Sequence, residues 1–140
     1  AGGLYPWIFL ALLRALQKEL PDVKVETVPG IPSFCAAAAL TGFALGEGKE
    51  PVTIVPTADD LTAVEKALRR GGTIVLMKIG ERLPAILGIL AAHGLLDRAV
   101  LVARAGQAGQ RVVTDLRQLG PADASIGYLA VILVHAGKGS

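Results

Sequence analysis

The chain has 140 residues, of which 52% are apolar and 4% aromatic. This length and composition predict one ordered region with an aliphatic α/β core and exclude a disordered chain. Its 14 basic and 12 acidic residues are scattered and form no lysine and arginine stripe, so nucleic acid is not an expected partner. A single cysteine excludes an internal disulfide and a thiolate zinc site, and it favours a reducing, cytoplasmic setting.

The first element is an amphipathic helix over Trp7 to Leu20, which Pro21 ends. Its richest apolar run, Trp7 to Leu13, is closed by Arg14 and is too short to span a bilayer. No membrane association is therefore expected. The alternating pattern from Val23 to Val28 then predicts a short strand.

A turn at Pro29-Gly30 leads from this strand into a second helix over Pro32 to Leu40, which is rich in alanine. The start of a helix offers free backbone N–H groups and the positive end of its dipole, and small side chains allow close approach. The turn is therefore predicted to bind a small polar ligand. Cys35 lies in this helix and is interpreted as a small buried hydrophobic residue rather than a nucleophile.

A glycine-rich, charged connection over Gly42 to Pro51 forms the best internal boundary. Val52 to Val55 is predicted to be a strand, and Leu61 to Arg70 a helix that Gly71-Gly72 ends. Asp59-Asp60 precedes that helix directly, so we interpret the pair as cap and dipole partners rather than catalytic carboxylates.

The second half of the chain turns from helices to strands. Thr73 to Ile79 is a continuous apolar strand, as expected when both faces are covered, and Pro84 to His93 is a helix. Ala99 to Ala105 and Gln110 to Thr114 are predicted to form a hairpin, and Leu129 to Val134 is a last buried strand. The predicted fold is α/β, with a mixed β-sheet flanked by helices.

Groups for acid–base or metal chemistry are few. The two histidines, His93 and His135, are far apart in the sequence and lack metal-ligand spacing, so no metal site is expected. His93 is interpreted as a helix-end residue, and His135 follows the last predicted strand. No catalytic residue can be assigned. Methyl transfer from a sulfonium donor suits such a chain, because holding donor and acceptor in line contributes about 7–11 kcal/mol.

Four segments stand out: Val28 to Ser33, Gly72 to Lys78, the hairpin from Val102 to Val113, and Tyr128 to Val134. In that order they resemble the tetrapyrrole (corrin/porphyrin) methylases, and the resemblance extends over nearly the whole chain. Within this family, Leu76-Met77-Lys78 and the strand that begins after Gly127-Tyr128 are most similar to the precorrin-2 or cobalt-factor II carbon-20 methyltransferases.

The resemblance implies S-adenosyl-L-methionine held by main-chain contacts in a cleft between two α/β domains, with a tetrapyrrole, precorrin-2 or cobalt-factor II, facing its methyl group. A homodimer is expected. By motif match, the residues implied to bind the cofactor are Pro29, Gly30, Pro32, Ser33, Met77, Ala105 and Ala130. Without the family, Met77 would be interpreted as a core residue and Ser33 as a helix cap.

Family members are usually longer, with a Pro-x-Gly loop and a Gly-Asp-Pro segment before the first helix. Residues 1–48 are therefore expected to be a remnant of the N-terminal methylase domain, and 49–140 a complete C-terminal methylase domain. Other interpretations remain open: a uroporphyrinogen-III or later precorrin methyltransferase, a relative that methylates ribosomal RNA or diphthamide precursors, or a non-catalytic dimerisation module. The lack of a basic stripe weighs against the RNA option.

Overall fold

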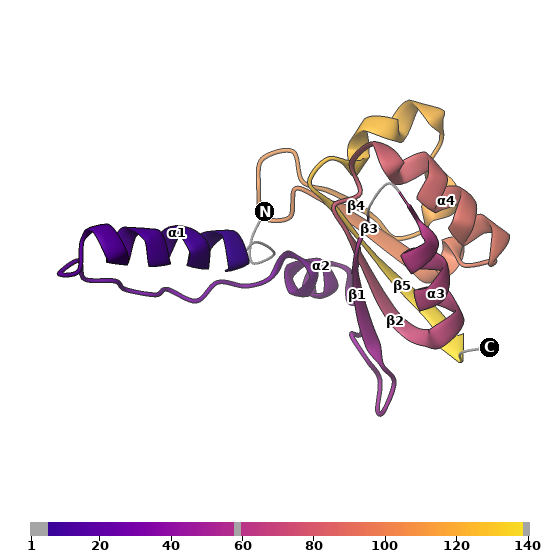
Figure 1. The fold of residues 1–140 in the computed structure, drawn as a ribbon. Coiled ribbons are helices and arrows are strands. Elements are labelled where there is room, and N and C mark those ends of the chain that lie inside the picture. Colours follow the sequence, from indigo (N-terminus) through magenta and orange to yellow (C-terminus); the bar gives the residue numbers. More distant parts are fainter. Residues whose placement is uncertain (1–5, 58–59, 139–140) are drawn as a thin grey trace. The chain divides into compact units, whose positions relative to one another are not determined.

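The computed structural model describes residues 6–57 and 60–138, in two compact units over 1–33 and 34–140. The first unit holds α1 (Pro6–Glu19), which confirms the predicted amphipathic helix (Figure 1). The predicted strand at Val23–Val28 is wrong, since this segment has no regular secondary structure. Alternation of apolar residues predicts an extended backbone, but a strand also requires a hydrogen-bonded neighbour.

The second unit is built on a five-stranded sheet with the order β1-β2-β5-β3-β4. β1 is parallel to β2, and the other neighbours are antiparallel, so the mixed sheet is confirmed. The helix α3 (Thr62–Arg70) connects the parallel pair, as a parallel connection requires. The strands are β1 (Val52–Pro56), β2 (Gly71–Met77), β3 (Ala99–Ala103), β4 (Arg111–Val113) and β5 (Ala130–Lys138).

One face of the sheet packs against α3, α4 (Leu83–Ala92) and the 3-10 segment η4 (Pro121–Gly127) (Figure 1). Alternate strand residues, among them Ile74, Leu101 and Ile132, are fully buried against these helices. Each such side chain stabilises the fold by about 1.5–3 kcal/mol. Three shorter 3-10 segments complete the unit: η1 (Gly80–Arg82), η2 (Leu96–Arg98) and η3 (Leu116–Gln118).

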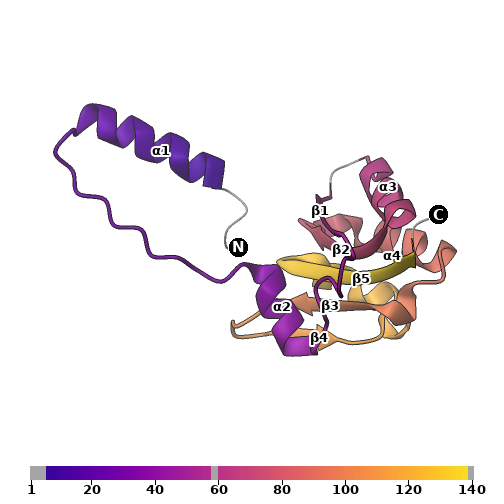
Figure 2. The ribbon, with the colours of Figure 1, turned by 90° about the horizontal axis from the view of Figure 1, so that it is seen from below.

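The opposite face of the sheet is also apolar, and α2 (Ser33–Thr41) lies on this side (Figures 1 and 2). Every residue of β2 is buried, which confirms a strand covered on both faces. The Phe43 ring stacks on His135 with centroids 3.8 Å apart. His135 lies inside β5, which runs four residues beyond its predicted end at Val134 and ends at Lys138.

The last residues of β5 pair with Gly71 and Gly72, which directly follow α3 and begin β2. Gly71 has φ 82° and donates its N–H to carbonyls in the last turn of α3, and it pairs with Lys138 of β5. Gly72 has φ 79°, and a Cβ there would lie 2.3 Å from the Pro51 carbonyl oxygen. The two glycines thus allow an abrupt change from helix to strand without a connecting loop.

Candidate functional site

The carboxyl ends of β1, β2 and β3 meet the beginning of β5 at one end of the sheet. Pro56 pairs with Met77, and Ala103 pairs with Ala130. Ala105 follows β3 by two residues. The structure therefore brings Met77, Ala105 and Ala130, three of the residues implied to bind the cofactor, to the same end of the second unit.

The backbone at this end of the sheet is strained. Among residues 6–57 and 60–138, Lys78, Arg104 and Leu129 are the non-glycine residues with positive φ, at 56°, 52° and 54°. Lys78 follows β2, Arg104 follows β3 and Leu129 precedes β5, and we call these three residues the strained rim. The left-handed conformation costs a residue with a Cβ about 1–2 kcal/mol, so neighbouring groups must hold it.

Thr57 and Arg82 hold the Lys78 end of the rim. The Thr57 hydroxyl lies 3.0 Å from the Met77 carbonyl oxygen and 2.8 Å from that of Lys78, and the Thr57 N–H donates to the Met77 oxygen at 2.8 Å. The hydroxyl has one proton and donates to one carbonyl at a time. Arg82 Nη2 donates to the Lys78 oxygen at 2.8 Å. Thr57, which is 5% exposed, thus ties the end of β1 to the end of β2.

The Arg104 end of the rim is held by main-chain bonds. The Arg104 N–H donates to the Leu129 carbonyl oxygen at 3.0 Å, so these two left-handed residues face each other across neighbouring strands. The Gln107 N–H donates to the Arg104 oxygen at 2.9 Å, and the Gly106 N–H donates to the Gln110 Oε1 at 2.7 Å. These bonds close the predicted hairpin and fix its first turn beside the start of β5.

Two of the three predicted contacts at this end are buried, main chain included. Met77 is 3% exposed, and Ala130 is 5% exposed and belongs to the core beneath the helices. Ala105 is half-buried. The interpretation of the Met77 side chain as a core residue is thus correct for its burial. A cofactor contact at Met77 or Ala130 stays a prediction.

The other four predicted residues lie at the junction before α2. Pro29, Gly30 and Pro32 are exposed, and Ser33 is the first residue of α2 and half-buried. The predicted helix start is confirmed. All four belong to the first unit, whereas Met77, Ala105 and Ala130 belong to the second. Their joint role in one cofactor site stays a prediction.

Of the carboxylate pair before α3, Asp60 contacts the first residue of the helix. The Asp60 carboxylate accepts hydrogen bonds from the Thr62 hydroxyl and from the Thr62 N–H, which is 2.9 Å away, and these two bonds lower the pKa of Asp60. Asp59 lies outside the described residues. Asp60 is thus a partner of the first helical residue, as predicted, whereas the capping position itself is Leu61, which makes no side-chain cap bond.

The histidines and the cysteine take structural positions. His93 Nε2 lies 2.8 Å from Glu65 Oε2, which connects the end of α4 to the first turn of α3. Sequence reasoning missed this pair because its members lie 28 residues apart. Cys35 is half-buried in α2. Within the described ranges 6–57 and 60–138, no three histidine, cysteine or carboxylate side chains gather as metal ligands, and no helix is long and apolar enough to cross a membrane.

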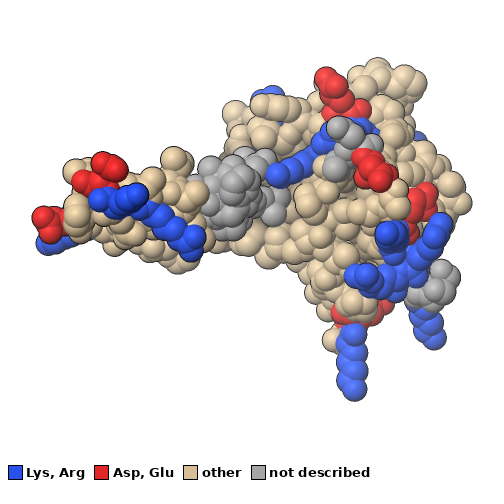
Figure 3. Space-filling view, in the orientation of Figure 1, with Lys and Arg blue, Asp and Glu red and all other residues tan. Residues whose placement is uncertain are grey.

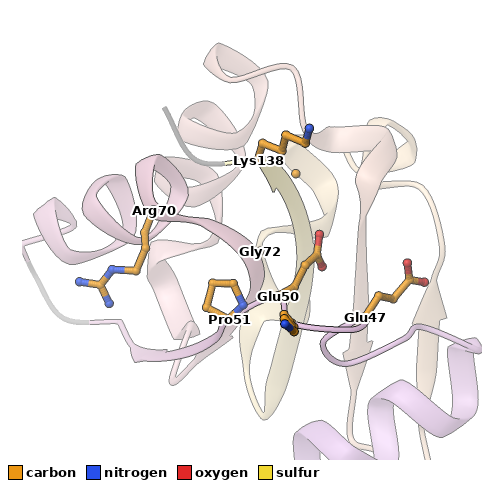
Figure 4. Close-up of a pocket in the computed structure, with 8 residues that line it drawn as sticks. Glu47, Glu50, Pro51, Arg70, Gly72 and Lys138 are labelled. Carbon is orange, nitrogen blue, oxygen red and sulfur yellow. The ribbon is translucent and has the colours of Figure 1, made fainter.

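A hollow of about 390 Å³ lies at the opposite end of the sheet, where β2 begins and β5 ends (Figure 4). It is lined by Glu47, Lys49, Glu50, Pro51, Arg70, Gly72, Gly137 and Lys138. The labelled charged side chains point in different directions and carry both signs, so they converge on no single ligand group (Figure 4). Lysine and arginine side chains also gather over α3, where Arg69 and Arg70 form the last turn (Figure 3).

The fold defines an α/β unit with a mixed five-stranded sheet, and comparisons identify its family. A sequence model of the tetrapyrrole (corrin/porphyrin) methylases matches residues 6–120. The chain is 30% identical over 129 residues to a cobalt-precorrin-2 C(20)-methyltransferase of Salmonella typhimurium, covering 92% of this chain and 52% of that protein. It is 32% identical to a precorrin-2 C(20)-methyltransferase of a Sinorhizobium species, covering 81% of this chain and 45% of that protein. The chain belongs to the tetrapyrrole methylases, as its motifs predicted.

Two solved structures share the fold. The cobalt precorrin-4 methyltransferase CbiF superposes with a TM-score of 0.66 at 24% identity and covers 94% of this chain and 59% of its own. The methyltransferase CobJ gives a TM-score of 0.56 at 22% identity, covering 91% of this chain and 58% of its own. The chain thus spans about half the length of the curated relatives that it matches.

Proposed function

We propose that this chain is part or all of an S-adenosyl-L-methionine-dependent C-methyltransferase that acts on precorrin-2 or cobalt-factor II. One observation supports this above all: the similarity to two C(20)-methyltransferases extends over 92% and 81% of the chain. The order of the four motifs and the meeting of Met77, Ala105 and Ala130 at one end of the sheet agree with it.

The residues next to the strained rim suit such a cofactor. Ala103, Ala105 and Ala130 have small side chains, and no atom lies within 4 Å of the position that a Cβ of Gly106 would occupy. When bound, the sulfonium cofactor supplies an electrophilic methyl group. The rim then contributes main-chain contacts and orientation, because hydrogen bonds fix its backbone beforehand. Because the cofactor supplies the reactive group and the protein supplies orientation, a chain with few acid–base groups can support the reaction.

The domain boundary, assembly and location of the protein belong to the same proposal. Residues 1–48 would be the end of an N-terminal methylase domain, and 49–140 the C-terminal domain. The protein would form a homodimer in the cytoplasm. Sedimentation velocity tests the assembly, and a monomer at micromolar concentration would contradict it.

Two alternatives differ from this proposal in testable ways. A uroporphyrinogen-III or later precorrin methyltransferase would bind the same cofactor but transfer the methyl group to another tetrapyrrole. A non-catalytic dimerisation module would self-associate without binding cofactor. The observation that favours this second alternative is that the chain matches only about half the length of the curated relatives.

Calorimetry with S-adenosylhomocysteine tests the proposal. We expect saturable binding by the unmodified chain and loss of binding in Ala105→Leu, which adds a bulky side chain at a predicted contact. Ala108→Leu is the matched control, because Ala108 is exposed in the same hairpin and lies outside the predicted site. Absence of heat at millimolar ligand would contradict a working cofactor site. Transfer of a radiolabelled methyl group to candidate tetrapyrroles then distinguishes the branches of the family.

A further inference from the structure

Basic side chains from segments far apart in the sequence meet at the end of the sheet where β2 begins and β5 ends. Arg69 and Arg70 form the last turn of α3, and both are exposed. Gly71, the next residue, pairs with Lys138 of β5, which is also exposed. Because paired strands lie about 5 Å apart, the backbones of Arg70 and Lys138 are within about 10 Å of each other.

A third segment adds Arg98. A Cβ on Gly137 would lie 3.5 Å from Nη1 and 3.7 Å from Nη2 of Arg98, so this guanidinium lies beside the residue that precedes Lys138. We call Arg69, Arg70, Arg98 and Lys138 the basic end of the sheet. In the part of the chain that the structure describes, none of these four residues forms an ion pair. The sequence shows no basic stripe because only the fold brings the three segments together.

The surface around the basic end carries charges of both signs. The hollow at this end is lined by Arg70 and Lys138 and also by two carboxylates, Glu47 and Glu50, and the side chains point apart (Figure 4). A small ligand with one charged group does not contact side chains that point apart, whereas a broad partner surface does. The two carboxylates would repel phosphate groups, so the pattern disfavours a nucleic acid.

Exposed apolar residues lie next to these charges. Pro51 lines the same hollow and leads into β1, which is an edge strand of the sheet. Val52 and Ile54 of β1 are 42% and 43% exposed. An apolar centre beside a polar, charged rim is typical of surfaces through which proteins bind each other. A phosphate backbone gains nothing from such apolar residues, so a protein is the partner that this surface fits.

We propose that the basic end and the neighbouring residues of β1 bind a short acidic segment of another protein. Carboxylates of that segment pair with Arg70 and Lys138, since arginine binds a carboxylate through two parallel hydrogen bonds and lysine does so as a compact charge. An apolar residue of the same segment covers Val52. This surface lies at the opposite end of the sheet from the strained rim, so the proposal is independent of the methyltransferase activity.

Fluorescence anisotropy of the whole chain with a labelled peptide of alternating glutamate and leucine tests the proposal. We expect saturable binding by the unmodified chain, which weakens as the salt concentration rises, and at least tenfold weaker binding by Arg70→Gln/Lys138→Gln. Arg14→Gln/Lys18→Gln is the matched control, because it removes one arginine and one lysine from α1, and it should bind as the unmodified chain does. Equal weakening in the two double variants, or no saturable binding by the unmodified chain, would overturn the proposal.

A second variant distinguishes an acidic protein segment from a nucleic acid. Val52→Thr keeps a β-branched residue in β1 and removes an apolar contact. We expect it to bind the peptide severalfold more weakly and to bind a single-stranded DNA oligonucleotide of equal charge as the unmodified chain does. If the unmodified chain binds the oligonucleotide more tightly than the peptide, the basic end is a nucleic-acid surface and the proposal fails. Far-UV circular dichroism shows that each variant is folded.

Discussion

Gly127 is expected to be among the least replaceable residues of the second unit, although nothing in its backbone conformation requires glycine. A Cβ at this position would lie 2.2 Å from the Gly80 carbonyl oxygen and 3.2 Å from the Leu83 Cβ. The nearest atom belongs to the backbone, so no change of rotamer relieves the clash, and η1 and η4 must separate. Overpacking of this kind costs about 1–3 kcal/mol.

Urea denaturation measures the effect as the free energy of unfolding of Gly127→Ala. The matched control is Gly88→Ala in α4, where no atom lies within 4 Å of the new Cβ. Since alanine is favoured over glycine inside a helix, the control is expected to gain about 0.5–1 kcal/mol. The same substitution then has opposite signs at the two positions. If Gly127→Ala is as stable as the unmodified chain, η1 and η4 do not pack as closely as described.

Three further predictions concern the second unit. The Gly120 N–H and the Arg111 guanidinium hold the pKa of Asp123 below its ordinary value. The ionised Asp123 carboxylate therefore stabilises the folded state above a pH of about 4, and this stabilisation is lost as the pH falls through the pKa of the folded state. Stability of Asp123→Asn should therefore fall less on acidification, as thermal unfolding at several pH values would reveal. Thr57→Val removes a hydroxyl that lies within hydrogen-bonding distance of two carbonyl oxygens and donates to one of them, so it should lower the free energy of unfolding by about 1 kcal/mol. An unchanged value would mean that the hydroxyl stabilises neither strand end. Lys78→Gly relieves a left-handed residue and should be neutral or stabilising, whereas Lys66→Gly, on the exposed side of α3, should cost about 1 kcal/mol. Equal losses in the two lysine variants would contradict the strain assigned to Lys78.

The helices and strands of the second unit could be predicted because their signals are local. The uninterrupted apolar run of β2 and the residues around α3 each determine the state of their own segment. The strand predicted at Val23–Val28 shows the limit of such signals. Alternation describes which residues a strand would present to each face, but pairing depends on a second segment that the pattern does not contain.

The same distinction between local and remote signals applies to the candidate site. Met77, Ala105 and Ala130 could be named from motifs, because each motif is continuous in sequence. The strained rim could not, since φ values at Lys78 and Arg104 depend on partners from other strands and loops: Thr57 and Leu129 respectively. Neither position contains glycine, the usual sequence signal for a left-handed residue. The left-handed backbone at Lys78 and Arg104 is therefore a property of the folded unit, because the hydrogen bonds that hold it come from residues remote in the sequence.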